Sequence, residues 1–476
     1  MEMRIKITKD SAGYKKLLEC KRLPSYFVEG DEVVTDELSY ATIFGGKVSH
    51  VEMIDAPHLL DFQRMEVNTA LTTKRHASLM DCGLGKTPVA LAFAHSVAKI
   101  GKVLILCPLS VYEQFMRESK RWHGSRLIDL RHGETWESGV AILNYEARRD
   151  IDMTGVSGIV LDEASILKND TGETRNYLCK LAENVEYRLT TSATPAPNDQ
   201  EEYASQAVFL GLVKSAKEFY GRFFRKEGNS WVLKGWAVNR FYEYLSTWAT
   251  YIKSPSALGF DCMTEMQEEP DYIFKRCEVD HDWNDSYDTA KKGENINLFQ
   301  TAEDGRYRSK VFGKIRCQKD SERTKSIMDF IDGKRSIIWC SRNAEDEMFG
   351  SMIPNSVIVN GAMDIEKRIV VVDKWRNGEI DHIISKPSVL GFGINLPESD
   401  VMVFSGYTYS FEQFYQAVRR SHRYGRRGRL RVLVPYTFPE LPILNSLREK
   451  MATFEKDVAE LQSKITYKRK PAGHNE

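Results

Sequence analysis

The 476-residue sequence has no long apolar run, no CxxC cysteine pair and no excess of either sign of charge. No stretch approaches the roughly 18 apolar residues that cross a bilayer, and the first residues lack the apolar core of a signal peptide. The 8 cysteines are scattered, which argues against both a zinc site and a disulfide framework. We therefore expect an intracellular, cytoplasmic protein with reduced thiols and no membrane partner.

The balance of charge leaves the choice of partner open. Lysine plus arginine and aspartate plus glutamate both number 67, so net charge gives no argument for nucleic acid, and local patterning must supply one. With 42% hydrophobic residues, the composition is that of a globular protein. A chain of this length is expected to form two or more domains.

The most informative stretch is LMDCGLGKTPVAL, which begins at Leu79. Glycines allow backbone amides to curl around phosphate oxygens, because no Cβ stands in the way. A lysine after the glycines neutralises phosphate charge, and the next threonine can ligate Mg²⁺. The sequence therefore predicts a phosphate-binding loop that opens a helix, whose dipole favours the bound phosphates. The residues assigned to this loop are Gly83, Leu84, Gly85, Lys86 and Thr87.

Two residues near this loop allow more than one interpretation. Met80 stands where the strict GxxxxGKT pattern has its first glycine, so a GKT tripeptide in an unrelated loop is the alternative. Gln63 lies in the apolar stripe of a helix predicted near residues 59–71. A solvated helix face is the ordinary explanation of such a glutamine. Its amide both donates and accepts, however, so it could bond both edges of an adenine.

An acidic pair follows an apolar strand in GIVLDEAS, which begins at Gly158. Parallel sheets present their chemistry at the ends of their strands. A plain strand cap is one interpretation of this pair. After a GKT loop, the better one is that Asp162 holds Mg²⁺ through a water while Glu163 orients or deprotonates the attacking water. A further strand ends in TTSATPAP, which begins at Thr190. This strand end therefore carries several small hydroxyl residues.

The chain then changes character twice. Residues from about 200 to 325 begin as helical, aromatic-rich segments with interleaved Lys and Arg and continue as a polar linker. Core packing is the default explanation of these aromatic residues, and a DNA-facing protrusion is the second. After them, RSIIWCS, SVIVNG and HIISKP predict the buried strands of a second α/β region, which lacks a phosphate loop of its own.

Arginines cluster near the end of this second region, in QAVRRSHRYGRRGRLR. A solvated basic face is the usual explanation. Arg420 and Arg423, three residues apart, also suit another role, in which they complete the nucleotide site of the first α/β region across a cleft. Gln416 lies at helical spacing from both of them.

Taken in order, these segments resemble the motifs of the Snf-type (Swi/Snf-related) DNA-translocating ATPases of helicase superfamily two. Gln63 resembles the adenine-contacting glutamine, and DCGLGKT resembles the family's DEMGLGKT, which also lacks the first glycine. The other segments that match are CPLSVYEQFMRE, LNYE, DEAS, SATPAPND, GFGIN and QAVRRSHRYGRR. Together they span residues 59–430, most of the chain. The compactness of the chain resembles bacterial or phage-encoded members.

The resemblance implies a role for each matched residue. Lys86 and Thr87 would bind the β- and γ-phosphates and magnesium, and Asp162 with Glu163 would serve hydrolysis. Arg420 and Arg423 would be paired arginine fingers, while Gln63 and Gln416 would contact the nucleotide. The chain departs from the family at four positions, where Pro387 and Ser388 replace a Thr-Arg pair, Ser165 replaces the histidine of the acidic box, and Arg419 replaces an acidic residue.

The expected fold is α/β, with two RecA-like parallel-sheet lobes and a helical insertion between them. The expected domains are a lead-in (1–55), a first lobe that binds ATP (56–212), a helical insertion and linker (213–325), a second lobe with the arginine fingers (326–436), and a C-terminal brace helix with a basic tail (437–476). Apolar residues from Leu444 to Ile465 follow a heptad pattern, which could dimerise or pack back on the first lobe. We favour the second arrangement and a monomer.

The resemblance implies a DNA-dependent ATPase that uses ATP and Mg²⁺, translocates on double-stranded or forked DNA, and remodels forks or protein–DNA complexes. Protein partners in replication, recombination or repair would fit such an enzyme. Two rival functions stay open at this point. One is a strand-separating DNA or RNA helicase, and the other is a DNA-binding regulator that binds ATP without hydrolysing it.

Overall fold

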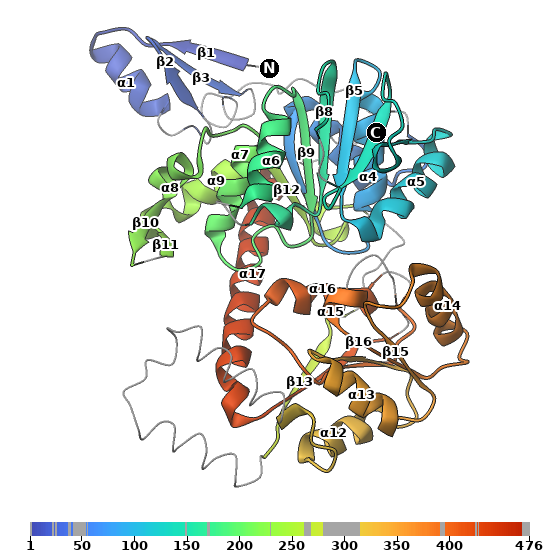
Figure 1. Ribbon diagram of the computed structural model, residues 1–476. Coiled ribbons are helices and arrows are strands. Elements are labelled where there is room, and N and C mark those ends of the chain that lie inside the picture. The colour runs from blue at the N-terminus through green and yellow to red at the C-terminus, as the bar shows by residue number, and fades with distance from the viewer. Residues whose placement is uncertain are drawn as a thin grey trace, which may run out of the picture. The chain divides into compact units, whose positions relative to one another are not determined.

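The computed structural model describes residues 2–20, 23, 26–36, 40, 54, 56–147, 150–168, 172–228, 230–260, 268–278, 315–390, 396–423, 426 and 428–468. The chain divides into two compact units, drawn in Figure 1. The first comprises residues 1–262 and 454–476, and the second comprises residues 263–453. Within the described ranges, no helix combines the length and the apolar character needed to cross a bilayer.

The N-terminal lead-in forms a small three-stranded antiparallel sheet in the order β1-β3-β2. One helix lies between β1 and β2 in the chain. Its elements are β1 (Glu2–Lys6), α1 (Ser11–Cys20), β2 (Phe27–Glu29) and β3 (Glu32–Asp36). Ile5, Cys20, Leu23 and Val33 form its buried core. The strands correspond to short β-like runs of the sequence such as MRIKIT and EVVT. The apolar stripe of α1, which includes Leu17, is short and gives only a weak helical signal.

The main sheet of the first unit has seven parallel strands in the order β12-β4-β9-β8-β5-β7-β6. Near-continuous apolar runs such as VLILC and VAILN are typical of strands that are covered on both faces. The strands are β4 (Arg75–Met80), β5 (Lys102–Cys107), β6 (Ile128–Asp129), β7 (Val140–Asn144), β8 (Val156–Asp162), β9 (Tyr187–Ser192) and β12 (Ala249–Ile252).

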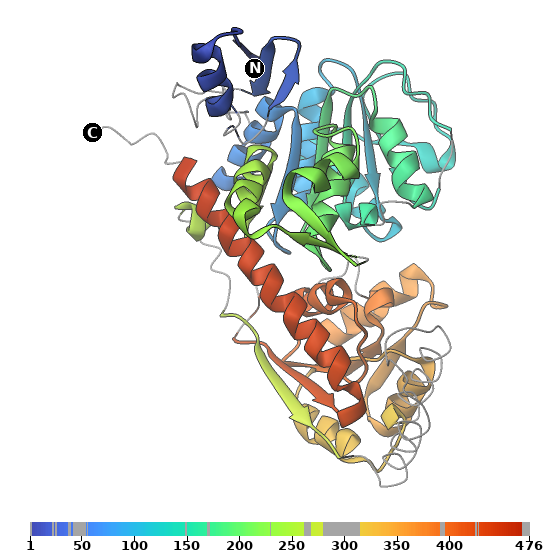
Figure 2. The ribbon, with the colours of Figure 1, turned by 90° about the vertical axis from the view of Figure 1, so that its left-hand side faces the viewer.

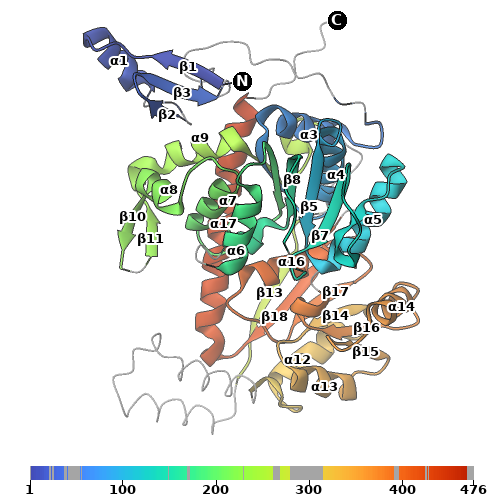
Figure 3. The same ribbon diagram turned by 45° about the horizontal axis from the view of Figure 1, so that its top comes forward.

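Helix α4 packs against β5, β8 and β9 and contacts α3 and α5 (Figure 3). It is almost entirely apolar, as a helix pressed between a sheet and neighbouring helices should be. Besides α1, the described α-helices of this unit before residue 440 are α3 (Asp61–Thr73), α4 (Lys86–Val97), α5 (Leu109–His123), α6 (Glu173–Ala182), α7 (Tyr203–Phe209), α8 (Ala216–Phe223) and α9 (Val238–Trp248).

The stretch predicted as an insertion and linker, 213–325, contributes an edge strand to each main sheet. Strand β12 pairs with β4, and Tyr251 lies opposite Leu79. In the second unit β13 (Asp271–Arg276) pairs with β18 (Arg431–Tyr436). The expected domain boundaries stay a prediction. The sequence did not indicate the edge strands, because a four-residue strand such as ATYI is too short to show a period of two after an aromatic helix.

Core packing is confirmed for most aromatic residues of this stretch. Phe219 and Phe241 lie at the centre of a cluster of edge-to-face contacts, with ring centroids 6.1 Å apart. The buried members are Phe219, Tyr220, Phe223, Phe224, Phe241, Tyr242, Tyr244 and Trp248. These rings therefore belong to the hydrophobic core and are not available for stacking. Trp236, which is 68% exposed, is a clear exception.

The second unit is built on a six-stranded parallel sheet in the order β13-β18-β17-β14-β16-β15. Its remaining strands are β14 (Ser336–Trp339), β15 (Ser356–Val359), β16 (His382–Ser385) and β17 (Val401–Phe404). Its helices before residue 440 are α12 (Glu322–Ile331), α13 (Asn343–Met352), α14 (Ile365–Arg376), α15 (Pro387–Leu390) and α16 (Phe411–Ser421). Two α/β units with parallel sheets confirm the expected fold class.

A single long helix, α17 (Leu441–Lys468), ends the described chain (Figure 2). Leu444 and Leu447 are buried in its first turns, which belong to the second unit. From Phe454 onward the helix belongs to the first unit, where Phe454 lies 6.2 Å from Tyr251 between ring centroids. Apolar positions of the heptad pattern are thus covered within the chain itself.

Candidate active site

The loop between β4 and α4 has the backbone that a phosphate site needs. Gly83 and Gly85 have φ values of 89° and 84°, in the left-handed region that favours glycine. A Cβ on Gly85 would lie 2.3 Å from the Gln63 side-chain nitrogen, so a larger residue would be both strained and crowded. Helix α4 begins at Lys86, directly after this turn. Its free amides therefore face the loop, as anion binding requires.

Gln63 is placed against the loop by two main-chain hydrogen bonds. Its Nε2 donates to the carbonyl oxygen of Leu84 at 2.9 Å, and its Oε1 accepts from the amide of Leu60 at 2.9 Å. The side chain is buried, which disfavours the interpretation as a solvated helix face. The structure thus brings Gln63 to the phosphate loop, and its contact with adenine stays a prediction.

Lys86 and Thr87 occupy the first turn of α4. The Lys86 Nζ donates to the carbonyl oxygen of Met80 at 3.1 Å, so the ammonium lies back over the loop. Gln114 on α5 donates to the Thr87 hydroxyl at 3.5 Å and to Glu118 at 2.7 Å. Gln114 belongs to the CPLSVYEQFMRE segment. Sequence reasoning gave it no role, although that segment was singled out.

Asp162 ends β8 and is buried at the same edge of the sheet as the loop. Burial raises the pKa of its carboxyl, and the hydrogen bond from Thr191 and the charge of Lys86 oppose that rise. The hydroxyl of Tyr145 donates to the Asp162 main-chain carbonyl and, at 3.2 Å, to that of Leu106. The loop follows β4 and Asp162 ends β8, and both strands pair with β9, so the two lie at the carboxyl ends of neighbouring strands of one sheet.

Glu163 adopts a backbone conformation that is rare for a residue with a side chain, with φ 59° and ψ 65°. Such strain persists only where the surroundings fix it, and it is typical of functional sites. The Ser192 hydroxyl donates to the Glu163 carboxylate at 3.2 Å. Ser192 ends β9, so the strand next to β8 holds Glu163 in place.

The contacts of Thr191 and Ser192 with the acidic pair follow from strand register. Asp162 lies directly opposite Thr191 in the β8–β9 ladder. The sequence marked the hydroxyl residues that begin at Thr190 as a strand end, but it could not pair them with Asp162 and Glu163. The members of each pair are 29 residues apart in the chain. They meet only because β8 and β9 are neighbours in the sheet.

The oxygen atoms at this edge fit a magnesium ion that is shared with phosphates. Thr87 offers a hydroxyl and Asp162 a buried carboxylate, and both are ligands that Mg²⁺ prefers. In the part of the chain that the structure describes, no cluster of three or more His, Cys, Asp or Glu side chains could hold a metal ion by itself. The donor set therefore matches a site that the phosphates of a nucleotide would complete.

The predicted arginine fingers lie at the end of α16 in the second unit. The main-chain oxygen of Arg420 accepts from the amide of Leu396 at 2.8 Å, and the Arg423 oxygen accepts from Arg426 at 3.2 Å. Gln416 is buried on the same helix and donates to Glu412 at 3.4 Å. The finger roles and the nucleotide contact of Gln416 stay predictions. The GFGIN segment, 391–395, lies outside the described residues.

Arg419, which replaces an acidic residue of the family pattern, is part of the interior of the second unit. Its guanidinium bonds the ring of His422 and lies 3.8 Å from the Glu269 carboxylate. It also lies 5.0 Å from the centroid of the Tyr415 ring. This departure therefore has a structural role, because the arginine links α16 to the segment that precedes β13.

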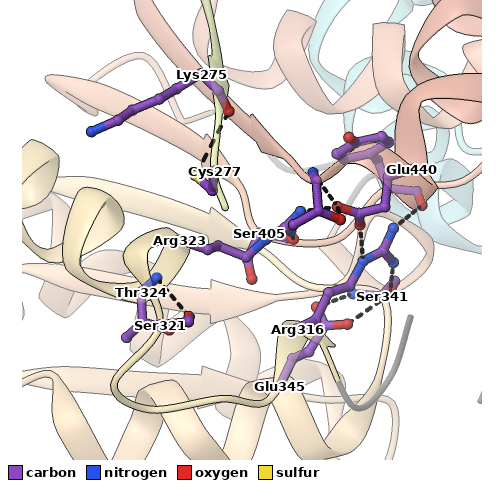
Figure 4. Close-up of polar contacts among 12 residues, drawn as sticks. Lys275, Cys277, Arg316, Ser321, Arg323, Thr324, Ser341, Glu345, Ser405 and Glu440 are labelled. Atoms are coloured by element: carbon purple, nitrogen blue, oxygen red, sulfur yellow. Dashed lines mark hydrogen bonds and ion pairs between the residues drawn. The ribbon is translucent and has the colours of Figure 1, made fainter. Parts of the chain in front are cut away.

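A buried ionic network, which sequence reasoning missed, fixes the loops after β14 and β17 (Figure 4). Glu440 accepts from Arg316 at 2.6 Å and from Arg323, and all three side chains are at most 4% exposed. Arg316 also donates to the Ser341 hydroxyl at 2.8 Å and to the Tyr407 carbonyl at 3.2 Å. Ser341 and Tyr407 line a cavity of about 70 Å³, together with Lys386, Ser388 and Gln413.

The pKa of Glu440 shows which interaction dominates in this network. Burial alone would raise it, but Arg323 and Arg316 outweigh burial and hold the pKa below its usual value. Glu440 ends the short helix Phe438–Glu440, directly before α17. Because Glu440 lies more than 100 residues after both arginines in the chain, no local pattern of the sequence could indicate their pairing.

Two family models match the chain. The SNF2-related domain matches residues 64–229, which include the phosphate loop and the acidic pair. The helicase conserved C-terminal domain matches residues 321–425, which include Gln416, Arg420 and Arg423. Together the two matches span more than half of the chain.

Several curated proteins are similar to part of the chain. A DNA repair and recombination protein, RAD54-like, of Danio rerio is 28% identical over 176 residues, 30% of this chain and 24% of that protein. The DNA repair protein rhp54 of Schizosaccharomyces pombe is 29% identical over 33% of this chain and 22% of its own length. The ATP-dependent helicase FUN30 of Saccharomyces cerevisiae is 25% identical over 36% of this chain and 18% of its own length. The chain thus matches less than a quarter of the length of each of these relatives.

A solved structure, the Sulfolobus solfataricus SWI2/SNF2 ATPase core in complex with dsDNA, aligns with 89% of this chain and 96% of that chain. The sequence identity is 18% and the TM-score is 0.42. A score this low adds nothing to the fold described above.

Proposed function

Since the chain belongs to the Snf2-type ATPases of helicase superfamily two, we propose that it couples ATP hydrolysis to movement along double-stranded DNA and so remodels forks or protein–DNA complexes. One observation carries the catalytic part of this proposal. The carboxyl ends of β4, β8 and β9 bring the phosphate loop, the acidic pair and its hydroxyl partners to one edge of a sheet.

Each side chain at this edge suits one task in phosphoryl transfer to water. The amides of Gly83 to Gly85 and the Lys86 ammonium would bind the nucleotide phosphates. Thr87 and Asp162 would hold magnesium, which when bound neutralises charge on the phosphates. Glu163, whose backbone is fixed by its strained turn and whose carboxylate accepts from Ser192, would orient and deprotonate the attacking water.

The second unit would complete the site by means of Arg420 and Arg423. Arginines that reach a γ-phosphate stabilise the charge of the transition state, and such contributions to kcat are large. Loss of the γ-phosphate on hydrolysis would release both side chains. Alternate binding and release of the second unit would then move the protein along DNA, if both units grip phosphates of one strand.

DNA as the partner is supported by the names of two relatives, which are DNA repair proteins. Contacts with the phosphate backbone are mainly electrostatic, so the affinity for DNA should fall steeply with salt. The preference for duplex DNA over single strands rests on the family resemblance. Protein partners in replication, recombination or repair are part of the same proposal.

Displacement of a third strand from a triplex tests translocation without requiring strand separation. We expect the wild-type protein to displace the third strand in the presence of ATP and Mg²⁺. Glu163→Gln should bind ATP but displace nothing, whereas Glu398→Gln, a change at a half-exposed carboxylate of the second unit, should behave as wild type. Separation of a plain forked duplex without triplex displacement would instead support a strand-separating helicase.

The arginine fingers need a test of their own. Arg423→Ala should leave ATP binding within about twofold and lower kcat by roughly 10³-fold or more, because the side chain would act on the transition state. Arg429→Ala removes a half-exposed arginine from the same cluster and is the matched control. Equal kcat values for the two variants would contradict the assignment.

A further inference from the structure

The hairpin formed by β10 (Phe224–Glu227) and β11 (Ser230–Leu233) carries an exposed aromatic residue at its exit. The hairpin is a sheet of its own, and in Figures 1 and 3 it extends from α8 away from the main sheet of the first unit. Trp236 follows β11 in the short helix Gly235–Ala237 and is 68% exposed. An exposed indole of this kind offers a flat face on which a ligand with a π-face can stack.

The segment that carries this ring is rich in lysine, and the Lys234 Nζ lies 5.5 Å from the ring centroid. Between residues 212 and 236 there are two glutamates, and each is already paired, Glu218 with Arg222 at 2.5 Å and Glu227 with Arg225 at 2.6 Å. Among the described residues, no carboxylate lies within ion-pair distance of the lysines of this segment. These lysines are Lys214, Lys217, Lys226 and Lys234. The segment therefore carries net positive charge in a chain whose net charge is zero.

Contacts of β11 and of the residue that follows it hold the hairpin and the ring in place. The Trp231 ring stacks on Tyr220 of α8 at 4.8 Å between centroids, and the Trp231 amide donates to Glu201 at 3.2 Å. The Nζ of Lys234 donates to the Gly221 carbonyl at 3.1 Å and lies 5.5 Å from the Trp236 ring centroid. A ring supported in this way loses little conformational freedom when it binds a partner.

We propose that Trp236 and the lysines of residues 212–236 bind unpaired bases of DNA at a junction between duplex and single strand. An indole offers a flat face on which a base can stack, and the lysines match the charge of the adjoining phosphates. Inside a duplex the faces of the bases are covered by their neighbours, whereas bases in a single-stranded tail are accessible. The contact would therefore distinguish forked or tailed DNA from an uninterrupted duplex.

The position of the hairpin also predicts an effect on ATP turnover. Glu201, which accepts from the Trp231 amide, lies in the segment that leaves β9. Ser192 at the end of β9 donates to Glu163. DNA bound at the hairpin would thus act on the segment that positions the acidic pair. Only this effect on ATP turnover rests on the proposed function. Binding of tailed DNA can be measured without ATP and does not depend on it.

The test compares a blunt duplex with the same duplex carrying a single-stranded tail, by fluorescence anisotropy without nucleotide. For Trp236→Ala we expect the Kd for tailed DNA to rise roughly five- to a hundredfold and the Kd for blunt duplex to stay within about twofold. Trp236→Phe should recover part of the affinity. Tyr14→Ala, at another exposed aromatic residue of the first unit, is the matched control and should bind both DNAs as wild type does.

A second readout reports stacking directly. 2-Aminopurine placed in the single-stranded tail should lose fluorescence on binding to the wild-type protein and less of it on binding to Trp236→Ala. The proposal is overturned if Trp236→Ala binds both DNAs as wild type does, which would leave the ring to another partner such as a protein. Equal weakening on both DNAs would also overturn it. Failure of both blunt duplex and forked DNA to stimulate ATP turnover would instead contradict the proposed translocase and leave the binding result intact.

Discussion

Replacement of Glu440 by glutamine should destabilise the second unit strongly. Glu440→Gln keeps the shape of the side chain but removes the charge that Arg316 and Arg323 share, and all three side chains are at most 4% exposed. Removing one partner of a buried ion pair costs about 3–5 kcal/mol, because a charge is left buried without compensation. Here two guanidinium groups lose their carboxylate, so we expect a value at the upper end of that range.

Hydrogen exchange locates the effect within the chain. Since each 1.36 kcal/mol corresponds to a factor of ten, amides of β14 should exchange faster by roughly two to four powers of ten in Glu440→Gln. Amides of β5 in the first unit serve as the internal reference and should change little. Glu398→Gln is the control variant, because Glu398 is 36% exposed and lies 3.8 Å from Arg376. A surface pair of this kind is worth less than about 1 kcal/mol.

The same network sets the sign of an acid effect. The pKa of Glu440 in the folded protein lies below its usual value of 4.5, so the stability that the network contributes is complete above that pH. It is lost as the pH falls through the folded-state pKa. Exchange in β14 should therefore accelerate more in the wild type than in Glu440→Gln below pH 4.5. A change of less than about fivefold in β14 at neutral pH, or equal changes in β14 and β5, would refute the reasoning.

Two further predictions concern the first unit. Gly85→Ala forces φ 84° on a residue with a Cβ and places that Cβ 2.3 Å from the Gln63 side-chain nitrogen. The affinity for ATP, measured by titration with a fluorescent analogue, should therefore fall at least about tenfold. Gly124→Ala is the control and should bind ATP as wild type does, because Gly124 has φ 63° but a Cβ there would meet nothing within 4 Å. Asp457→Ala removes the acceptor of the Tyr242 hydroxyl and should cost about 1–3 kcal/mol in urea unfolding, whereas Asp457→Asn keeps an acceptor oxygen. Burial raises the pKa of Asp457, so the stability of the wild type should decline as the pH rises through that pKa. The stability of Asp457→Asn should not change over the same pH range. A parallel decline in both proteins would contradict the titration of Asp457 as the cause.

The parts of the site that are local in sequence were predictable. Apolar runs bounded by turn residues gave the parallel strands, and the loop from Gly83 to Thr87 required left-handed glycines that the structure contains. Asp162 was expected at a strand end and ends β8. These features depend on neighbours within a few residues, so a sequence pattern can carry them.

The parts that depend on strand order and on burial could not be predicted. Thr191 meets Asp162 only because β8 and β9 are adjacent in the sheet. Glu440 meets Arg316 and Arg323 from a position more than 100 residues further along the chain. Exposure of Trp236 was equally hidden, since the aromatic residues around it in sequence are mostly buried.

ATP turnover by the purified protein tests the central claim most directly. It should be measured with no nucleic acid, with single-stranded, duplex and forked DNA, and with RNA, for the wild type and for Glu163→Gln. We expect strong stimulation by duplex or forked DNA and at least a roughly 10²-fold loss in Glu163→Gln. Stimulation by RNA or single strands alone would favour a strand-separating helicase. An absence of turnover with every nucleic acid would contradict the account and favour a regulator that binds ATP without hydrolysing it.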